Sequence, residues 1–451
     1  MTVPLSHPAA AAADGSASLA TPGARVRLYP WVVVGTLSIA HLVSFIDRFV
    51  MSLVLTPIKG QMHLSDTQLG AIQGLSFVLL YSVAGLPLGR LADTMDRRRL
   101  IALGMLIWSA ATTACAFCND FGGLFAARIG VGFGEAALVP AAMSLIAGYF
   151  ARERLGRAVS VFVMGSPLGK VVALIGGAWL LAQVIPRHGA SLLGHSFTPW
   201  QLLFLCAALP GLLLIPAVLA LREPPRAAVT LVRPRFLDGL AHIKRFALAY
   251  ALQAAAACMA IILVQAFGAW GPTFFGRVYH LTVSQTGYLV GGVTLIASPL
   301  GNLFGGWLTD VLQRRKIPAA PLIAIGLSLA LAIPAALALA AAPNLPSAAI
   351  AFGALTFILS TAAGPCLAGI QVLTPTQHRG TATALYMCVM TLVSVGLGPT
   401  LVGVISDTVF GAGAGIGKAL IASTIGVALL GILAAVAGRR PFERAAAASP
   451  S

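Results

Sequence analysis

The sequence predicts an all-α membrane protein in which twelve transmembrane helices form two six-helix bundles related as parallel repeats. Three observations predict it. Hydrophobic residues make up 58% of the 451 residues and charged residues only 9%. The apolar residues gather in stretches of membrane length, and one motif recurs in both halves of the chain. A soluble chain carries about a quarter charged residues, so a water-facing surface of this size is excluded.

The apolar stretches are long enough to cross a bilayer, which takes about 20 residues in a helix. They are apolar on every face, which favours helices over the alternating strands of a barrel. The twelve expected spans are 30–55, 67–90, 100–118, 122–150, 158–185, 200–221, 247–275, 284–309, 318–341, 347–373, 381–405 and 418–438.

The basic residues lie mainly on one side of the predicted spans. With the N-terminus assigned to the cytoplasm, 22 of the 29 Lys and Arg residues are cytoplasmic and 3 lie within spans. The other side holds four, namely Lys59, Arg187, Arg277 and Lys418. This bias predicts that both termini are cytoplasmic. Because the bases are spread over short loops and form no single soluble face, nucleic-acid binding is not expected despite the net charge of +16.

A polar, basic segment at 222–246 divides the spans into six and six, and we interpret it as a cytoplasmic linker. The N-terminal bundle is then 25–221 and the C-terminal bundle 247–438. Residues 1–24 are predicted to be a disordered tail, and 439–451 form a C-terminal tail.

An offset of 217 residues relates the two halves. It superimposes a Gly-x-Leu-x-Asp-x-x-x-Arg motif, whose key residues are Gly89, Asp93 and Arg97 in the first half and Gly306, Asp310 and Arg314 in the second. The same offset carries Leu64, Gln68 and Gly70 onto Leu281, Gln285 and Gly287. One register over two neighbouring regions predicts parallel internal repeats.

Two six-helix halves with this motif after the second and eighth spans resemble the major facilitator superfamily. Within it, Ile46-Asp47-Arg48, Leu64-Ser-Asp-Thr-Gln68-Leu-Gly70 and Gly-Phe-Gly-Glu135-Ala resemble the spinster family of lipid transporters and its bacterial relatives. The resemblance implies a secondary transporter that works by alternating access in a bacterial inner membrane. It implies no enzymatic activity and no cofactor.

The repeated motif predicts a cytoplasmic gate. Gly89 and Gly306 remove side chains where membrane helices approach closely. Asp93 is expected to accept hydrogen bonds from a neighbouring helix N-terminus and to pair with Arg97. The family resemblance implies that this cluster holds the cytoplasmic side shut when the cavity opens outward. Simple anchoring by positive charge is the alternative.

Five charged residues lie within the spans, namely Asp47, Arg48, Arg128, Glu135 and Lys170. Each unpaired charge at the bilayer centre costs about 2.5–3.5 kcal/mol, so these groups are expected to pair and to face a central cavity. Arg128 and Glu135 share one helix face about 10 Å apart. We predict that Asp47 pairs with Arg128 and Glu135 with Lys170, whereas Arg48 faces either the cavity or a neighbouring helix.

Such a cluster attracts anionic substrate groups and offers a route to proton coupling, because protonating the two acids changes its net charge. Static structural pairs are the alternative. The second half lacks the pair, since Asp47 and Arg48 map onto Val264 and Gln265. It offers Gln265, Asn302 and Tyr386 as possible substrate contacts, although such polar residues more often form hydrogen bonds between helices than bind a ligand.

These observations together predict a proton-coupled transporter of an amphipathic lysolipid or sphingolipid-like substrate. The alternative is a proton-linked transporter of small organic anions or drugs. Expected partners are the substrate, protons and membrane lipids, and we expect a monomer. The Cys115-x-x-Cys118 pair has no second thiol pair or histidine cluster beside it, so no metal site is predicted.

Overall fold

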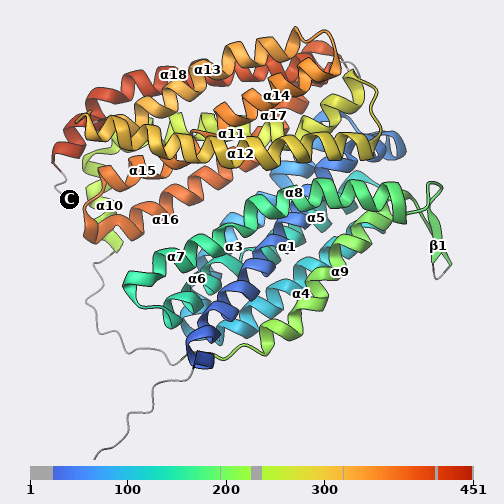
Figure 1. Ribbon diagram of the computed structural model, residues 1–451, viewed down its shortest axis with the longest axis horizontal. Helices are drawn as coiled ribbons and strands as arrows, with labels where there is room; N and C mark the ends of the chain where they lie inside the picture. Colours follow the sequence, from blue (N-terminus) through green and yellow to red (C-terminus); the bar gives the residue numbers. More distant parts are fainter. Residues whose placement is uncertain (1–23, 193, 225–235, 318, 412–414, 449–451) are drawn as a thin grey trace, which may run out of the picture.

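The computed structural model describes residues 24–192, 194–224, 236–317, 319–411 and 415–448. Two helical bundles lie side by side, with the N-terminal half in blue to green and the C-terminal half in yellow to red (Figure 1). Of the predicted N-terminal tail, 1–23 lies outside the described residues.

The N-terminal half is almost entirely helical, apart from a short antiparallel hairpin that pairs Ala190 with Phe197. Its elements are α1 (Ala24–Met62), α2 (Asp66–Gly70), the π-helical turn η1 (Ala71–Leu75), α3 (Ser76–Thr94), α4 (Arg97–Cys115), α5 (Phe121–Glu135), α6 (Leu138–Tyr149), α7 (Arg152–Val163), α8 (Gly165–Trp179), the π-helical turn η2 (Leu180–Val184), β1 (Ala190–Leu192), β2 (His195–Phe197) and α9 (Pro199–Leu219).

The C-terminal half follows a short helix, α10 (Phe236–Arg245), in the predicted linker. Its elements are α11 (Ala247–Val278), α12 (Val283–Arg314), α13 (Ala320–Ala340), α14 (Leu345–Ser360), α15 (Ala363–Leu373), the 3-10 turn η3 (Thr376–His378), α16 (Arg379–Met390), the π-helical turn η4 (Thr391–Val395), α17 (Gly396–Ile405), the π-helical turn η5 (Ser406–Phe410) and α18 (Ile416–Ala447).

The predicted membrane fold of two six-helix bundles is confirmed. Within the described ranges, eleven helical segments are long and apolar enough to cross a membrane. The remaining predicted span, 100–118, corresponds to α4, which is less apolar because it begins with Arg97, Arg98 and Arg99. Since α4 packs against α5 and α9, it occupies a place in the bundle like the other spans.

The repeat is visible in the way two helices begin. Ser65 and Gln68 form a capping box before α2, in which the Ser65 hydroxyl accepts the Gln68 backbone N–H at 3.1 Å. Thr282 and Gln285 form the same box before α12 at 3.3 Å. A Ser/Thr-x-x-Gln box satisfies two backbone donors that a helix start leaves unpaired. The repeated glutamines therefore fix equivalent helix starts in both halves.

The two halves touch at one end and diverge toward the other. We call the end with the β1–β2 hairpin the hairpin end, and the end with residues 224 and 236 the linker end. The principal contacts between halves join α2 and η1 to α17, and α8 to α12. At the linker end, α7 and α16 each pack mainly against elements of their own half and stand apart in Figure 1.

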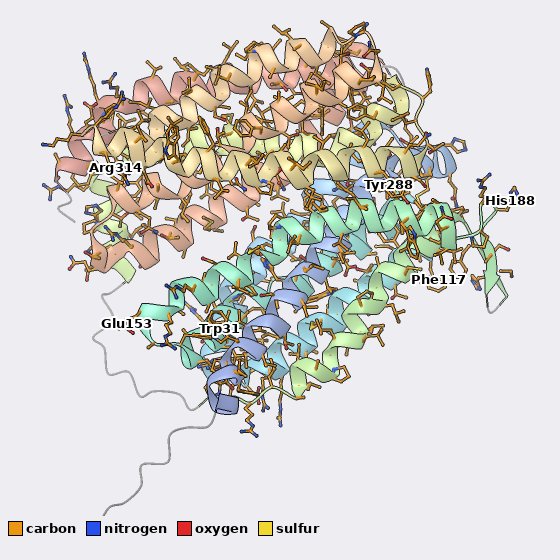
Figure 2. The ribbon with its side chains drawn as sticks, in the orientation of Figure 1. Trp31, Phe117, Glu153, His188, Tyr288 and Arg314 are labelled. Atoms are coloured by element: carbon orange, nitrogen blue, oxygen red, sulfur yellow. The ribbon has the colours of Figure 1, made fainter. Side chains whose placement is uncertain are left out.

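Charged side chains mark the linker end. Glu153 of α7 and Arg314 of α12 lie there, one on each half, while His188 lies at the hairpin end (Figure 2). Between the two ends, the outer faces of both bundles carry large exposed apolar side chains such as Leu213 and Leu303. This apolar band between the two polar ends is the surface that a bilayer covers.

The predicted linker is partly structured. Residues 225–235 lie outside the described residues, but α10 docks under the C-terminal half, where the ring Nε2 of His242 lies 3.3 Å from the Leu373 carbonyl oxygen. The predicted C-terminal tail also differs from expectation, because α18 continues as a helix through Ala447.

Candidate functional site: buried charges and the contact between the halves

Four of the predicted charged residues gather inside the N-terminal half. We call Asp47 and Arg48 of α1 together with Arg128 and Glu135 of α5 the charge cluster. Asp47 and Arg128 are 0% exposed and Glu135 is 2% exposed. The Arg48 side chain, at 12%, is the most accessible member. The cluster thus lies within the bundle and reaches accessible space through Arg48.

Arg48 and Glu135 form an ion pair, with Arg48 Nη2 donating to Glu135 Oε2 at 2.6 Å. Aromatic rings hold the guanidinium in place, since its Cζ lies 4.0 Å from the Phe77 ring centre and 4.5 Å from that of Phe45. Cation–π contacts of this kind stabilise a desolvated guanidinium. The partner of Glu135 is therefore Arg48, and the predicted pair with Lys170 is wrong in this conformation.

Asp47 and Arg128 are neighbours, but they do not form the predicted carboxylate–guanidinium pair. Arg128 Nη1 donates to the backbone carbonyl of Asp47 at 3.2 Å. Neither carboxyl oxygen of Asp47 has a hydrogen-bond partner among the described residues, and neither do Arg128 Nε and Nη2. Buried polar atoms without partners are rare in proteins, so this acid and this base are available for another interaction.

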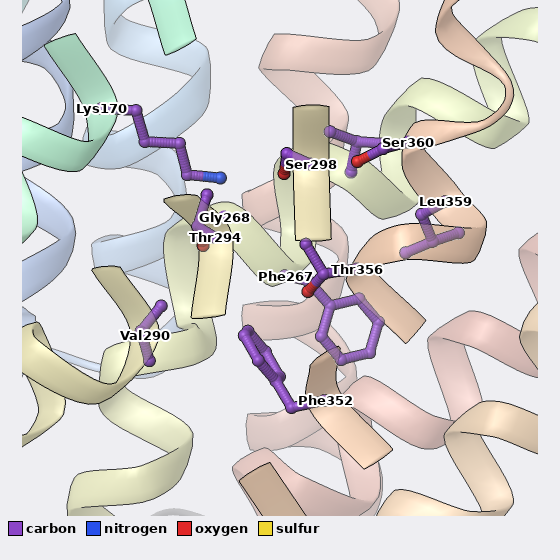
Figure 3. Close-up of a pocket in the computed structure, with 11 residues that line it drawn as sticks. Lys170, Phe267, Gly268, Val290, Thr294, Ser298, Phe352, Thr356, Leu359 and Ser360 are labelled. Atoms are coloured by element: carbon purple, nitrogen blue, oxygen red, sulfur yellow. The ribbon is translucent and has the colours of Figure 1, made fainter. Parts of the chain in front are cut away.

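Lys170 of α8 lies away from the charge cluster, at the contact between the halves. Its Nζ is 5.0 Å from the Phe49 ring centre, and it points into a cavity whose other walls belong to the C-terminal half (Figure 3). A Cβ added to Gly268 of α11 would lie 3.1 Å from Lys170 Nζ. The sequence predicted a pair between Lys170 and Glu135 because both were expected at the same depth in the membrane. In the structure, the Lys170 side chain points toward the C-terminal half instead.

The predicted substrate contacts of the C-terminal half do not line this cavity. Tyr386 is buried and donates its hydroxyl to the Cys366 carbonyl at 2.7 Å, a contact within its own half. Gln265 is half-buried beside Gly398, and Asn302 is exposed. Four hydroxyl residues line the cavity instead, and we call them the hydroxyl set: Thr294, Ser298, Thr356 and Ser360. The i, i+4 spacing of each pair was the available sequence signal, because it puts both members on one helix face.

The repeated motif lies at the linker end. Arg97 Nη1 is 3.4 Å from Glu223 Oε1 at the start of the predicted linker, and the side chain of Asp93 lies outside the described residues. In the second half, Asp310 and Arg314 are exposed, and no ion pair joins them within the described part of the chain.

Neither motif glycine makes a contact in this conformation that a side chain would disrupt, although α15 passes close to Gly306, since a Cβ added to Gly364 would lie 3.7 Å from the Gly306 backbone nitrogen. A Cβ added to Gly306 would meet nothing within 4 Å, and one added to Gly89 would meet Pro140 at an ordinary 3.8 Å. Among the described side chains of the motif, no ion pair joins Arg97 or Arg314 to the opposite half.

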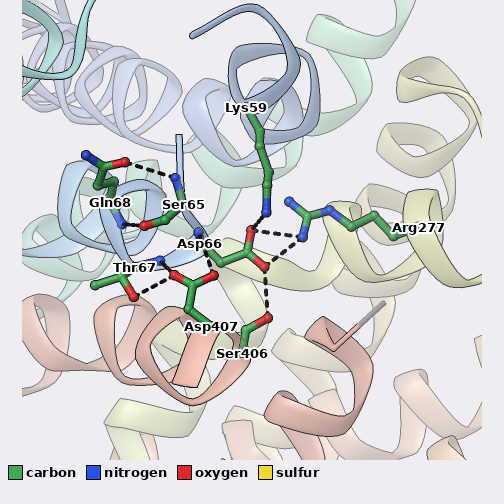
Figure 4. Close-up of polar contacts among 8 residues, drawn as sticks. All are labelled: Lys59, Ser65, Asp66, Thr67, Gln68, Arg277, Ser406 and Asp407. Carbon is green, nitrogen blue, oxygen red and sulfur yellow. Dashed lines mark hydrogen bonds and ion pairs between the residues drawn. The ribbon is translucent and has the colours of Figure 1, made fainter. Parts of the chain in front are cut away.

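A polar network that the sequence did not predict joins the halves at the hairpin end. The Asp66 carboxylate, 0% exposed, lies 2.6 Å from Lys59 Nζ and 2.9 Å from Arg277 Nη1. Ser406 of the C-terminal half donates its hydroxyl to the same carboxylate at 2.8 Å (Figure 4). One buried acid thus binds partners from both halves.

A second carboxylate also joins the halves, with the acid on the C-terminal half and the donors on the N-terminal half. Asp407 of η5 accepts the backbone N–H of Asp66 at 3.2 Å and that of Thr67 at 2.7 Å. It also accepts the Thr67 hydroxyl at 2.7 Å. Acceptors at a helix start bind unpaired N–H groups and favour the helix dipole. We call Lys59, Asp66, Thr67, Arg277, Ser406 and Asp407 the hairpin-end network.

Comparison with known proteins places this arrangement among membrane transporters. The family model described as Major Facilitator Superfamily matches residues 37–399. An MFS-type efflux pump of Mycolicibacterium smegmatis is 27% identical over 89% of this chain and 91% of that protein. Protein spinster homolog 1 of Xenopus tropicalis is 28% identical over 82% of this chain and 71% of that protein.

A solved structure has the same fold. The crystal structure of a bacterial homolog to human lysosomal transporter, spinster, in inward-facing and unoccupied conformation superimposes with a TM-score of 0.79 at 22% identity, covering 94% of this chain and 99% of that chain.

Proposed function

Because the chain belongs to the major facilitator superfamily, we propose that it is a proton-coupled secondary transporter that carries an amphipathic, lysolipid or sphingolipid-like substrate by alternating access. Membership makes the chain a multi-pass membrane transporter of a small molecule and not an enzyme. The proposal concerns its coupling ion, its substrate and its orientation in the membrane. One chain supplies both halves of the pathway, which supports a monomer.

We place the linker end in the cytoplasm of a bacterium, with the protein in the inner membrane. The excess of basic residues at that end supports this orientation. In that orientation the end at which the halves diverge faces the cytoplasm, and the hairpin end, where the Asp66–Arg277 ion pair joins the halves, is closed. Transport then requires this network to separate while the linker ends of the two halves approach.

The burial of the charge cluster carries the proposal of proton coupling. Asp47 presents a fully buried carboxyl without a hydrogen-bond partner among the described residues, and Glu135 binds Arg48. Protonating Glu135 removes the charge that holds Arg48, and this guanidinium then becomes available to an anionic substrate group. Proton and substrate thereby compete for the same base, which couples their movements.

Relatives support the proposed substrate class. The matched proteins include protein spinster of Drosophila melanogaster, 25% identical over 84% of this chain, and the sphingosine-1-phosphate transporter SPNS2 of Danio rerio, 24% identical over 65% of this chain. An amphipathic substrate suits a pathway that offers charged groups on the N-terminal half and aromatic rings such as Phe267 and Phe352 on the C-terminal half.

Uptake of labelled 1-oleoyl-lysophosphatidic acid into proteoliposomes tests this function. We expect an imposed proton gradient to stimulate uptake by the native protein, and Asp47→Asn and Glu135→Gln to abolish the stimulation. Asp238→Asn, an exposed acid on α10, is the matched control and should behave as native. Full gradient stimulation in both cluster variants would refute their role in coupling.

The alternative function is proton-linked transport of small organic anions or drugs. The matched efflux pump supports it, as does a probable L-galactonate transporter of Escherichia coli, 25% identical over 64% of this chain. Gradient-driven transport of labelled galactonate or ethidium, without transport of the lysolipid, would favour this alternative.

A further inference from the structure

Lys170 places an ammonium group where the two halves meet. It extends from α8 of the N-terminal half, while α11, α12 and α14 of the C-terminal half provide the facing wall of the cavity. Figure 3 shows the Nζ atom directed at the space between Thr294 and Ser298. The cavity is small in this conformation, with a volume of about 30 Å³.

This ammonium has no counter-ion among the described residues. The described ion pairs involve the charge cluster, the hairpin-end network and the linker end, and none includes Lys170. Its contact is with the π face of Phe49. An unpaired charge at this depth is costly, so a cation kept here without a protein partner indicates an interaction with something that enters the cavity.

The hydroxyl set completes a binding surface for oxygen atoms. Thr294 and Ser298 are four residues apart on α12, and Thr356 and Ser360 are four residues apart on α14, so all four reach the same cavity. None of these hydroxyls donates a hydrogen bond to another side chain or carbonyl in the described part of the chain. Each therefore retains a donor for a ligand.

The cavity also has room for the lysine because of its opposite wall. Gly268 of α11 presents no side chain, and a Cβ there would lie 3.1 Å from Nζ, closer than ordinary contact. Phe267 and Phe352 add apolar surface beside the hydroxyls. The surface thus combines one cation, several neutral donors and an apolar flank.

We propose that in this conformation, in which Arg48 stays paired with Glu135, Lys170 and the hydroxyl set bind the anionic group of the transported substrate, a phosphate or a carboxylate, between the two halves. This inference rests on the proposed function and specifies the charge of its substrate. Ammonium and hydroxyl donors together match an anionic oxygen group, whereas a neutral or cationic head group would leave the lysine unpaired. A ligand held by both halves favours the conformation in which they are close, and this links binding to the change of access.

Binding to purified protein in a neutral detergent tests the proposal with matched probes. 1-Oleoyl-lysophosphatidic acid and 1-oleoylglycerol differ by a phosphate, oleate and oleyl alcohol differ by a carboxylate, and sn-glycerol 3-phosphate lacks the acyl chain. We expect the native protein to bind at least one anionic lipid tenfold or more tightly than its neutral counterpart. Binding of glycerol 3-phosphate with equal affinity would identify a small anion, instead of a lipid, as the source of the group.

Variants test whether the preference for anionic over neutral probes arises in the cavity. Lys170→Met should reduce binding of the preferred anionic probe at least tenfold and leave binding of its neutral counterpart unchanged. Lys170→Arg should retain most of the affinity, and Thr294→Val should weaken it severalfold. Lys418→Met removes an exposed lysine elsewhere in the C-terminal half and serves as the matched control. Thermal unfolding without ligand establishes that each variant is folded.

Two results would overturn the inference: a native protein that binds anionic and neutral probes equally, or a folded Lys170→Met variant that keeps the native preference. The uptake experiment with Asp47→Asn and Glu135→Gln decides the proposed function separately. Lys170-dependent binding without gradient-stimulated uptake would refute proton-coupled transport of the lysolipid and leave the anion site standing. If the Lys170→Met variant shows the same gradient-stimulated uptake as the native protein, the anion site is refuted and proton-coupled transport of the lysolipid is retained.

Discussion

Asp66 of the N-terminal half and Arg277 of the C-terminal half form an ion pair at 2.9 Å, at the end of the molecule where the two halves meet. The Asp66 carboxylate is fully buried, and the Arg277 side chain is 11% exposed. Breaking a buried pair by removing one partner costs about 3–5 kcal/mol, because the other charge stays buried. The pair therefore stabilises the conformation in which the hairpin end is closed relative to one in which it is open.

Two glycines of the repeat allow the halves to touch. A Cβ added to Gly70 would lie 2.5 Å from the Pro399 carbonyl oxygen, and one added to Gly287 would lie 2.6 Å from the Ala178 Cβ. We expect Gly70→Ala and Gly287→Ala to destabilise this conformation by about 1–3 kcal/mol through overpacking, measured by thermal unfolding.

Matched controls exist on the same spans. Gly85→Ala and Gly292→Ala place a methyl group where nothing lies within 4 Å. Alanine is the better helix former, so these variants should be at least as stable as the native protein. Equal stability of all four variants would contradict the proposed contact between the halves.

A double-mutant cycle measures the pair between Arg48 and Glu135. Arg48→Met leaves a buried carboxylate without its partner and should cost about 3–5 kcal/mol. Adding Glu135→Gln should recover part of this loss, giving a coupling energy above about 1 kcal/mol in thermal unfolding. The exposed pair of Arg439 and Glu443, 3.2 Å apart, is the control and should couple by about 0.2–0.5 kcal/mol. A buried coupling no larger than this control would contradict the assignment.

Asp96 links stability to pH outside the membrane. Its carboxylate caps α4 through the backbone N–H of Arg98 at 2.9 Å, and it lies 2.6 Å from Arg98 Nη2. The hydrogen bond from the Arg98 side chain lowers the pKa of Asp96 from 3.8 to about 2. A lowered pKa means that the charged group stabilises the fold above pH 3.8, and that this stabilisation is lost as the pH falls toward 2.

Two variants separate the charge of Asp96 from its capping role. Asp96→Ala should cost about 1 kcal/mol at neutral pH, whereas Asp96→Asn keeps a capping oxygen and should cost less. The difference in unfolding temperature between the native protein and Asp96→Asn should stay constant from pH 7 to 5 and shrink below pH 4. An equal difference at pH 6 and pH 2.5 would refute the ionic contribution.

The sequence predicted the features that depend on local patterns. Apolar runs gave the span positions, and the offset between Gln68 and Gln285 revealed a repeat that the structure shows as two equivalent capping boxes. The occurrence of charged residues within apolar spans identified the residues of the charge cluster. The pairing within it depends on how each helix is rotated, and depth alone could not separate Arg48 from Lys170 as the partner of Glu135.

The contacts between the halves could not be predicted in this way. Asp66 and Arg277 are 211 residues apart. Asp66 lies at the start of one span and Arg277 at the end of another, where a charge is expected at the membrane surface. The sequence predicted only the depth of Lys170 in its span, whereas its surroundings come from α11, α12 and α14. Such contacts depend on the packing and conformation of both bundles, which the pattern along one helix does not encode.

Spin-label distances across both ends of the molecule test alternating access directly. In a background with the six cysteines replaced, one label pair occupies Glu153 and Arg314 at the linker end, and a second occupies His188 and Ala341 at the hairpin end, all exposed positions. Asp66→Asn weakens the hairpin-end network, whereas Asp120→Asn changes an exposed acid on the same side and is the control. We predict that Asp66→Asn lengthens the hairpin-end distance and shortens the linker-end distance, and that the control changes neither. Distances in Asp66→Asn that match the native protein at both ends, or that lengthen at both ends together, would contradict the account.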